Sequence, residues 1–238
     1  MSFPIFLGHA PLGAAAYSDK VLATASANLI AYWPLWEASG ATADNLEGTA
    51  ARDGTYTGVT LGQTGIGDGR TCPSFDGSGD FVNVYSASLA TAWNGAELSI
   101  AGWFKVVAST WTDSTYRNLW QFRYDVANDI YLEKSDVVGG IYLRRAGGGT
   151  IELLNYATGS PTTWMHFCAT VSETNDRCRL YLNGGTPVAS TGLGAWTGLP
   201  DTDWCNFGRY DSWVGLAAHV AVWTTELTAA QITNLATV

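Results

Sequence analysis

The sequence predicts an all-β protein, a sandwich of two antiparallel sheets with a short helix near each end of the chain. Roughly a dozen short segments alternate apolar and polar residues and are separated by turn-forming residues. Residues 164–184, WMHFCATVSETNDRCRLYLNG, hold two such segments joined by four polar residues, which is the pattern of a β-hairpin. No linker, repeat or low-complexity tract divides the chain, so we expect a single sandwich of two layers.

Length and composition limit the classes of protein that fit. A chain of 238 residues with 47% hydrophobic residues suits one large β domain. The net charge of −9 lacks the basic surface of a nucleic-acid-binding protein. No apolar run is long enough to span a membrane. The first 17 residues carry no positive side chain, which argues against a secretory signal peptide.

The N-terminal 28 residues are expected to form an arm and a short helix, followed by the sandwich at 29–238. Proline and glycine interrupt residues 1–17. Ser18 is placed to cap a helix that ends near 25–28, with Tyr17 and Leu22 as a hydrophobic staple.

Alternation and turn residues then define the strands in order. They are expected at 29–36, 72–76, 81–85, 98–107, 118–124, 129–134, 140–145, 150–156, 167–172, 178–183, 187–191, 204–208 and 215–223. Residues 37–58 are polar and glycine-rich and predict a long irregular loop. A last helix begins at Thr228, which forms a capping box with Gln231, while Leu227 and Ile232 form a staple.

Four cysteines are present, at positions 72, 168, 178 and 205. Their wide spacings, without a CxxC pair, argue against a zinc site. With the hairpin turn at 173–176, Cys168 and Cys178 do not oppose each other. A bridge between Cys72 and Cys205 is left open beside the expectation of four buried free thiols.

Four segments in order resemble the laminin-G-like branch of the concanavalin A-like lectin/glucanase superfamily. They are AYWPLWEASGATADNLEGTAARDGTYTG at 31–58, SFDGSGDFVNV at 74–84 with LSIAGWFK at 98–105, WMHFCATVSETNDRCRLYLNGGTPVAS at 164–190, and NFGRY with WVGLAAHVAVWTTELTAAQI within 206–232. The resemblance implies a concanavalin A-like jelly roll of two curved sheets. It also implies a mostly non-catalytic role in binding glycans or proteins.

The sequence departs from this family where relatives carry an acidic pair and a structural calcium. Those positions hold Ala218 and His219, although Asp44 in the long loop matches the family's usual Asp, and Asp76 and Asp80 hold their turn. Calcium needs six or more oxygen ligands, so no cofactor is predicted, and a structural calcium is left open as the alternative. The aspartates are expected to bond the backbone of their own turns.

No pattern of catalytic residues is present, and we expect the protein not to be an enzyme. The acidic triplet of the glucanase branch is missing, and the nearest acid clusters fall at strand ends or in turns. No GxSxG, HExxH or phosphate loop occurs. His166 and His219 fall on expected strands and are predicted to be satisfied by neighbouring groups.

Two aromatic loops predict a glycan site if they share one rim of the sandwich. Aromatic rings stack on sugar rings, and short polar side chains bond sugar hydroxyls. The predicted ligand-binding residues are Trp111, Asp113, Tyr116 and Arg117 in one loop and Arg209, Tyr210, Asp211 and Trp213 in the other. The alternative is that Trp111 and Trp213 fold back over the edge of the core.

An assembly role is the first functional expectation. The apolar arm at 1–17 suits contact with a protein partner or with another copy of the chain. Laminin-G-like sandwiches resemble modules that decorate virus particles of bacteria, so the expected location is a virion surface or the extracellular space. A glycan-binding, lectin-like module is the alternative.

Overall fold

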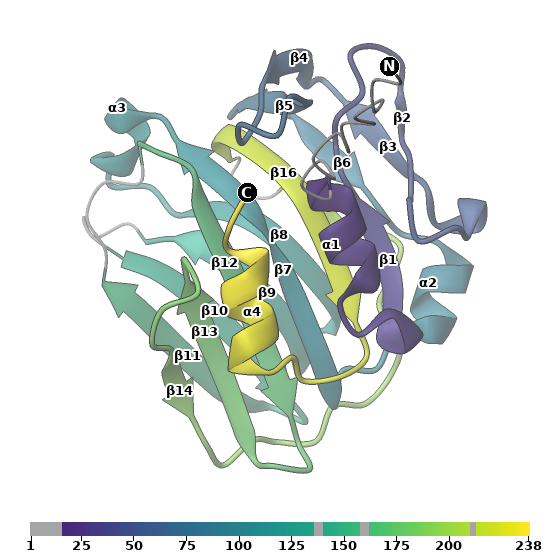
Figure 1. Ribbon diagram of the computed structural model, residues 1–238. Coiled ribbons are helices and arrows are strands. Elements are labelled where there is room, and N and C mark those ends of the chain that lie inside the picture. The colour runs from purple at the N-terminus through teal and green to yellow at the C-terminus, as the bar shows by residue number, and fades with distance from the viewer. Residues whose placement is uncertain (1–15, 136–139, 158–161, 210–212) are drawn as a thin grey trace, which may run out of the picture.

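The computed structural model describes residues 16–135, 140–157, 162–209 and 213–238, which form two stacked antiparallel sheets (Figure 1). Sheet A has the order β14-β13-β12-β7-β16-β5-β4, and β1 also pairs with β16. Its strands are β1 (Leu29–Trp33), β4 (Thr60–Thr64), β5 (Thr71–Asp76), β7 (Glu97–Val106), β12 (Met165–Ser172), β13 (Arg177–Leu182), β14 (Val188–Ser190) and β16 (Val214–Trp223). The predicted fold class is confirmed.

Sheet B has the order β11-β10-β9-β8-β15-β6-β3-β2. Its strands are β2 (Thr42–Ala43), β3 (Gly54–Thr57), β6 (Phe81–Asn83), β8 (Arg117–Asp125), β9 (Asn128–Lys134), β10 (Gly140–Gly147), β11 (Thr150–Ala157) and β15 (Asn206–Phe207). The meander β8 to β11 supplies one half of this sheet, as the alternation predicts.

The hairpin β12–β13 lies near one edge of sheet A with the predicted turn, because Ser172 pairs with Arg177. Strand β16 joins the other half of the sheet. Its first residues pair with β5 and its later ones with β1, while its opposite side pairs with β7. A bulge between Ala218 and Ala221 accompanies this change of partner, and His219 there takes a positive φ of 54°.

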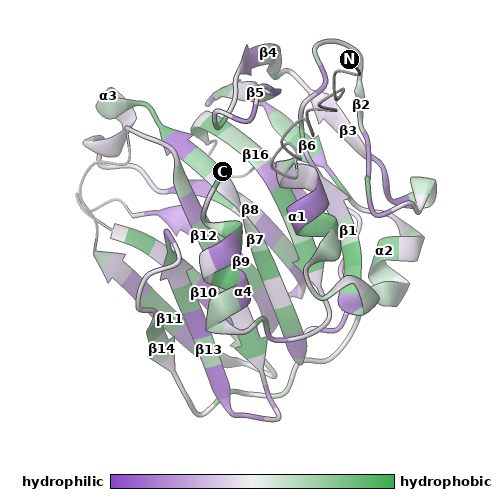
Figure 2. Cartoon of the chain, viewed as in Figure 1, coloured by the Kyte–Doolittle hydropathy of each residue, from purple (hydrophilic) through white to green (hydrophobic). Residues whose placement is uncertain are grey.

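Side-chain alternation places one row of every strand in the core. Across sheet B the inward row runs through Leu154, Leu143, Leu132, Trp120, Phe207, Val82 and Tyr56, all buried. They meet buried residues of sheet A such as Phe104 and Phe167. Figure 2 shows hydrophobic and hydrophilic patches alternating along the strands.

Two helices cover the outer face of sheet A. Helix α1 (Tyr17–Ala23) and helix α4 (Ala229–Leu235) lie in front of its strands in Figure 1. They enclose a second apolar cluster that includes Tyr17, Trp103 and Trp223. The large outer face left without such helices is that of sheet B.

The helix termini differ in how well the sequence predicts them. The capping box of α4 is confirmed, and Leu227 and Ile232 are buried. The predicted cap of α1 is wrong, because Ser18 lies within the helix, whose cap position is Ala16. Tyr17 begins this helix and sets its place, since its hydroxyl donates to Leu235 O at 2.8 Å.

Other differences are local. The predicted loop at 37–58 contains β2 and β3, whose Ala43 and Tyr56 face the core. Strand β4 and helices α2 (Ala87–Ala92) and α3 (Ala108–Trp111) are absent from the sequence prediction. The four cysteines are free and buried, as expected. Cys168 pairs with Tyr181 and Cys178 with Val171, and Cys72 and Cys205 lie outside any disulfide.

Candidate ligand-binding face

The two aromatic loops predicted from the sequence do share one rim. Strand β15 runs antiparallel to β8, with Phe207 opposite Trp120 and Gly208 N donating to Leu119 O at 2.9 Å. The end of β15 therefore lies beside the start of β8. The residues before Arg117 and after Gly208 leave the sheet at the same end of the sandwich.

The two tryptophans of this rim are buried. Trp111 is 3% exposed and Trp213 is 1% exposed, and both belong to the core between the sheets. The ring of Trp213 packs edge-on against Phe104, with centroids 5.7 Å apart. Neither indole offers a face to a sugar ring, so the predicted stacking by Trp111 and Trp213 is corrected to the alternative, in which they close the edge of the core.

Asp113 is the centre of a closed ion-pair network. It accepts from Arg117 Nη2 at 2.6 Å and from Lys134 Nζ at 2.7 Å. Lys134 is 1% exposed and also donates to the carbonyl of Thr115. Burial pushes the pKa of Asp113 upward, but the hydrogen bonds from the two cations outweigh it and hold the pKa below its usual value. These charges fix the loop onto β9.

Of the remaining predicted residues, Tyr116 and Arg209 lie next to the ends of β8 and β15 at this rim. Tyr116 is 45% exposed. Arg209 lies over the ring of Phe81 at 5.0 Å and donates to Asp203 O. Tyr210 and Asp211 fall outside the described residues.

The outer face of sheet B carries a row of outward-facing residues that are polar except for Leu153. Gln121 and Asn206 at its centre are buried, at 5% and 1% exposed, so the accessible members lie on either side of them. Adjacent strands align Leu153, Arg144, Tyr131, Gln121, Asn206, Asn83, Thr55 and Thr42 across the whole sheet. Each lies one residue from a member of the inward row. We call this set the outer row. Its amides, hydroxyls and guanidinium are groups that bond sugar hydroxyls, and Tyr131 lies among them.

Charged and aromatic pairs flank the outer row. Arg144 forms an ion pair with Asp129 and lies 5.6 Å from the ring centroid of Tyr131. Burial raises the pKa of Asp129, although Arg144 opposes this shift. Hydrogen-bond donors of a ligand would favour its ionised form. On the next row Tyr142 accepts from Asn155 Nδ2 at 2.9 Å.

These residues were outside the predicted site, although the sequence contains their signal. In β9 the outward positions read Asp129, Tyr131 and Glu133, and in β10 they read Tyr142 and Arg144. Alternating polar and aromatic residues on neighbouring strands mark a face. Only the packing of α1 and α4 on sheet A shows that the outer face of sheet B is the one without a covering helix.

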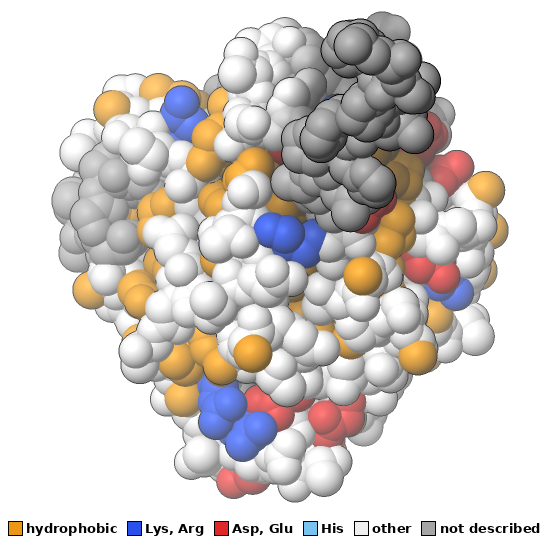
Figure 3. All heavy atoms as spheres, in the orientation of Figure 1, with side chains coloured by type: hydrophobic (Ala, Val, Ile, Leu, Met, Phe, Trp, Pro, Cys, Tyr) orange, Lys and Arg blue, Asp and Glu red, His pale blue; other side chains and the backbone are white. Residues whose placement is uncertain are grey.

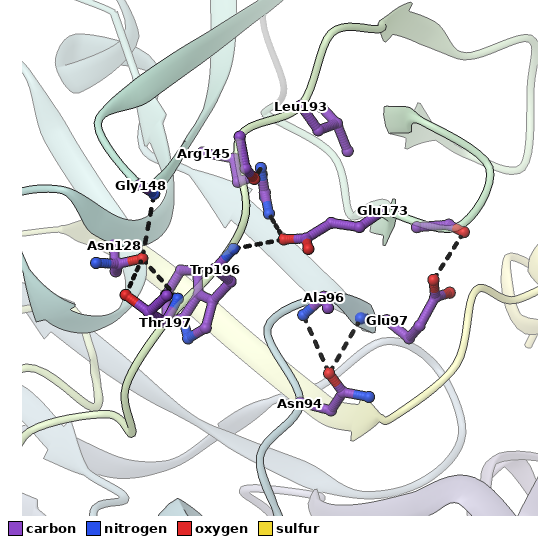
Figure 4. Close-up of polar contacts among 12 residues, drawn as sticks. Asn94, Ala96, Glu97, Asn128, Arg145, Gly148, Glu173, Leu193, Trp196 and Thr197 are labelled. Carbon is purple, nitrogen blue, oxygen red and sulfur yellow. Dashed lines mark hydrogen bonds and ion pairs between the residues drawn. The ribbon is translucent and has the colours of Figure 1, made fainter.

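The opposite end of the sandwich is closed by a buried cation, seen in Figure 4. Arg145 is fully buried, forms an ion pair with Glu173 of the β12–β13 turn, and donates to Gly194 O at 2.7 Å. The Glu173 carboxylate also accepts from Trp196 N at 2.6 Å, and Asn128 Oδ1 accepts from Thr197 N at 2.8 Å. This network joins the two sheets and holds the segment 193–198.

The family's calcium does not fit the residues of this chain. Within the described ranges no group of three or more His, Cys, Asp or Glu side chains is placed to hold a metal ion. Asp80 accepts from Asp76 N at 2.9 Å and Asp76 accepts from Ser78 N at 2.7 Å, which is turn chemistry. At the position of the acidic pair, His219 contacts Asp68 at 3.0 Å and Tyr32 at 2.7 Å.

The two strand histidines differ in their surroundings. His219 is satisfied by neighbours, as expected. His166 is wholly buried, and neither ring nitrogen has a hydrogen-bond partner. The prediction of a satisfied side chain is therefore wrong for His166, which packs edge-on against Trp103 with centroids 5.2 Å apart. Burial lowers the pKa of His166 to about 3.

Two stacked antiparallel sheets, one of them covered by α1 and α4 on its outer face, define the class of protein as a β-sandwich. A family model of the concanavalin A-like lectin/glucanases superfamily, Laminin_G_3, matches residues 76–233. This match covers more than half of the chain, and the chain therefore belongs to that family. A comparison with curated proteins gives no match.

Solved structures repeat the fold at low sequence identity. Domain 4 of the extracellular arabinanase AbnA from Geobacillus stearothermophilus, solved in complex with arabinotriose, is 16% identical, with 88% of this chain and 98% of that chain covered and a TM-score of 0.63. The binding domain of Paraclostridial Mosquitocidal Protein 1 is 14% identical over 88% of this chain and 52% of that one, with a TM-score of 0.66. The receptor binding domain of botulinum neurotoxin C/D mosaic serotype is 14% identical over 88% and 51%, with a TM-score of 0.65.

This chain thus spans about half the length of the two toxin structures. At these identities the likeness shows the fold alone. Among the helices of the described residues, none has the length and apolar character needed to cross a membrane.

Proposed function

We propose that the protein is a non-catalytic binding module that recognises a glycan, free or on a receptor, through the outer face of sheet B. The observation that carries this proposal is the outer row. It crosses all eight strands on the face that α1 and α4 do not cover. Its accessible members, on either side of the buried Gln121 and Asn206, combine hydrogen-bonding side chains with Tyr131. The arabinanase domain solved with arabinotriose supports this class of ligand, and the toxin domains support a role in binding.

The acidic residues support a role without catalysis. Glycoside hydrolysis uses two carboxylates that both reach the sugar. Glu173 is held by Arg145, and Asp176 Oδ1 accepts from Gly192 N and Leu193 N at 2.8 Å. Asp129, on the proposed face, is paired with Arg144. Each of these acids already has a structural partner.

The test is a binding screen of the full chain against a panel of oligosaccharides that includes arabinotriose. Tyr142→Ala removes an aromatic ring beside the outer row and should weaken binding of any hit by about tenfold, or about 1.4 kcal/mol. The matched control is Tyr124→Ala, because Tyr124 is 46% exposed and its register position lies beyond the outer row. Equal effects of both variants, or a panel without any hit, would count against the proposal.

A decoration or adhesion role on a phage particle is the second proposal, and it concerns residues 1–17. One observation favours it: Tyr17 is anchored on sheet A, since its hydroxyl also accepts from Trp103 Nε1 at 2.8 Å. A segment preceding Tyr17 therefore starts from a fixed point on the sandwich. Deleting residues 1–15 should abolish self-association or particle binding in sedimentation experiments while the sandwich stays folded. Unchanged association would exclude this role for the arm.

A further inference from the structure

Lys105 lies at the floor of a pocket on the outer face of sheet A, beyond the area that α1 and α4 cover. In β7 its neighbours Phe104 and Val106 face the core, so Lys105 points outward. Register places it beside Leu216 of β16, which in turn pairs with Ser74 of β5. The pocket has a volume of about 320 Å³.

The walls of the pocket are aliphatic. Leu216, Val107 and Ala108 line it, with the hydroxyl groups of Ser74 and Thr162 at its margin. Gly215 also lines it and has a φ of +150°. A Cβ at Gly215 would lie 2.2 Å from Lys105 O, so only glycine fits this close approach of two strands.

Lys105 is distinct among the cations of the described residues, which include every Lys and Arg of the chain. Each of the others has an ion pair, a hydrogen bond or an aromatic ring as a partner, as Arg144 has Asp129 and Arg70 has the ring of Trp36. Lys105 has none within those residues. Figure 3, which views the covered side of the sandwich, shows few charged side chains on this face.

The ammonium group of Lys105 lies beside aliphatic walls and lacks a counter-charge among the described residues. Lys105 is partly buried, so its amine loses some water and receives no counter-charge in return. Its four-carbon stem would serve equally well as a plain apolar cover that carries the amine into solvent. A negatively charged ligand distinguishes a binding role of Lys105 from a role as an apolar cover. Such a ligand would pair with the ammonium group and also contact the aliphatic walls.

We propose that this pocket binds a small organic carboxylate with an apolar body. One lysine matches one negative charge, whereas phosphate groups are generally held by several donors or by arginine forks. The lining residues that the structure describes include no aromatic ring, so they suit an alkyl chain rather than a sugar ring. The pocket lies on sheet A, whereas the proposed glycan site lies on sheet B, and the two ligands belong to different chemical classes.

The experiment is an NMR titration of amide shifts in the full chain with hexanoate, hexylamine and hexanol as probes. Hexanoate should give saturable shifts around Lys105, Ala108 and Leu216 with a Kd of about 1 mM, as expected for so small a ligand. Hexylamine should give none there, and hexanol should bind at least about tenfold more weakly. Equal shifts with hexanoate and hexylamine, or no saturable shift, would overturn the proposal.

Two variants assign the effect to the pocket. Lys105→Met keeps the apolar stem and removes the charge, and it should weaken hexanoate binding by about tenfold. Lys20→Met is the matched control, since Lys20 bonds Thr237 outside the pocket, and it should change nothing. Ala108→Phe fills the pocket and should abolish binding. Wild-type affinity in Lys105→Met or Ala108→Phe, with spectra showing a folded protein, would refute the site.

Discussion

His166 makes the stability of the protein depend on pH in a defined window. Burial lowers its pKa to about 3, whereas in the unfolded chain it titrates near 6.5. Between these values the unfolded state binds a proton that the folded state does not, so the free energy of unfolding falls as the pH falls. At pH 5, 1.5 units below the unfolded pKa, the loss is about 2 kcal/mol at 1.36 kcal/mol per unit.

The matched variant is His166→Leu, which conserves volume and removes both unbonded ring nitrogens. The backbone contacts of His166 with Asn183 remain available, since they use only main-chain atoms of residue 166. Urea unfolding followed by tryptophan fluorescence at pH 7, 6 and 5 measures the effect. We expect the wild type to lose about 2 kcal/mol from pH 7 to pH 5 and the variant to lose much less. Parallel pH profiles of the two proteins would refute the reasoning.

Three further predictions concern stability and reactivity. Glu173→Ala leaves the fully buried Arg145 without its counter-ion and should lower the free energy of unfolding by about 3 kcal/mol. Arg177→Ala, which removes a side chain that is 35% exposed and leaves Glu226 its second partner Arg179, should cost less than about 1 kcal/mol; similar losses in urea unfolding would contradict the role of burial. Thr228→Ala removes the capping box of α4 and should cost about 1 kcal/mol by the same assay, with no loss if the cap is unimportant. The four buried thiols have raised pKa values because of burial, so a disulfide reagent should label them only after unfolding; rapid labelling of the folded protein would contradict this.

The hairpin and the last helix show what local sequence predicts well. The turn at 173–176 and the capping box at Thr228 depend on neighbouring residues alone, and both are confirmed. The start of α1 was misplaced because Tyr17 is fixed by Leu235 and Trp103, which are distant in sequence. Tertiary contacts of this kind outweigh a capping preference worth about 1 kcal/mol.

The candidate site could not be predicted from local sequence patterns alone, because it depends on burial and on the order of the strands. A polar neighbourhood around Trp111 and Trp213 suggested exposed rings, yet both complete the core where the sheet ends. The register of β8 and β15 brings their loops together, as the sequence suggested, but Asp113 then turns toward Lys134. The outer row depends on the order of eight strands, which pairs residues far apart in the sequence, as Asn83 and Asn206 are.

The measurement that tests the central claim most directly is the affinity of one oligosaccharide hit for two tyrosine variants. Tyr131→Ala changes the middle of the outer row, and Tyr116→Ala changes the exposed tyrosine of the predicted rim. We expect the Kd to rise by about tenfold for Tyr131→Ala and to stay unchanged for Tyr116→Ala. The reverse result would place the ligand on the rim loops and contradict binding by the outer face of sheet B.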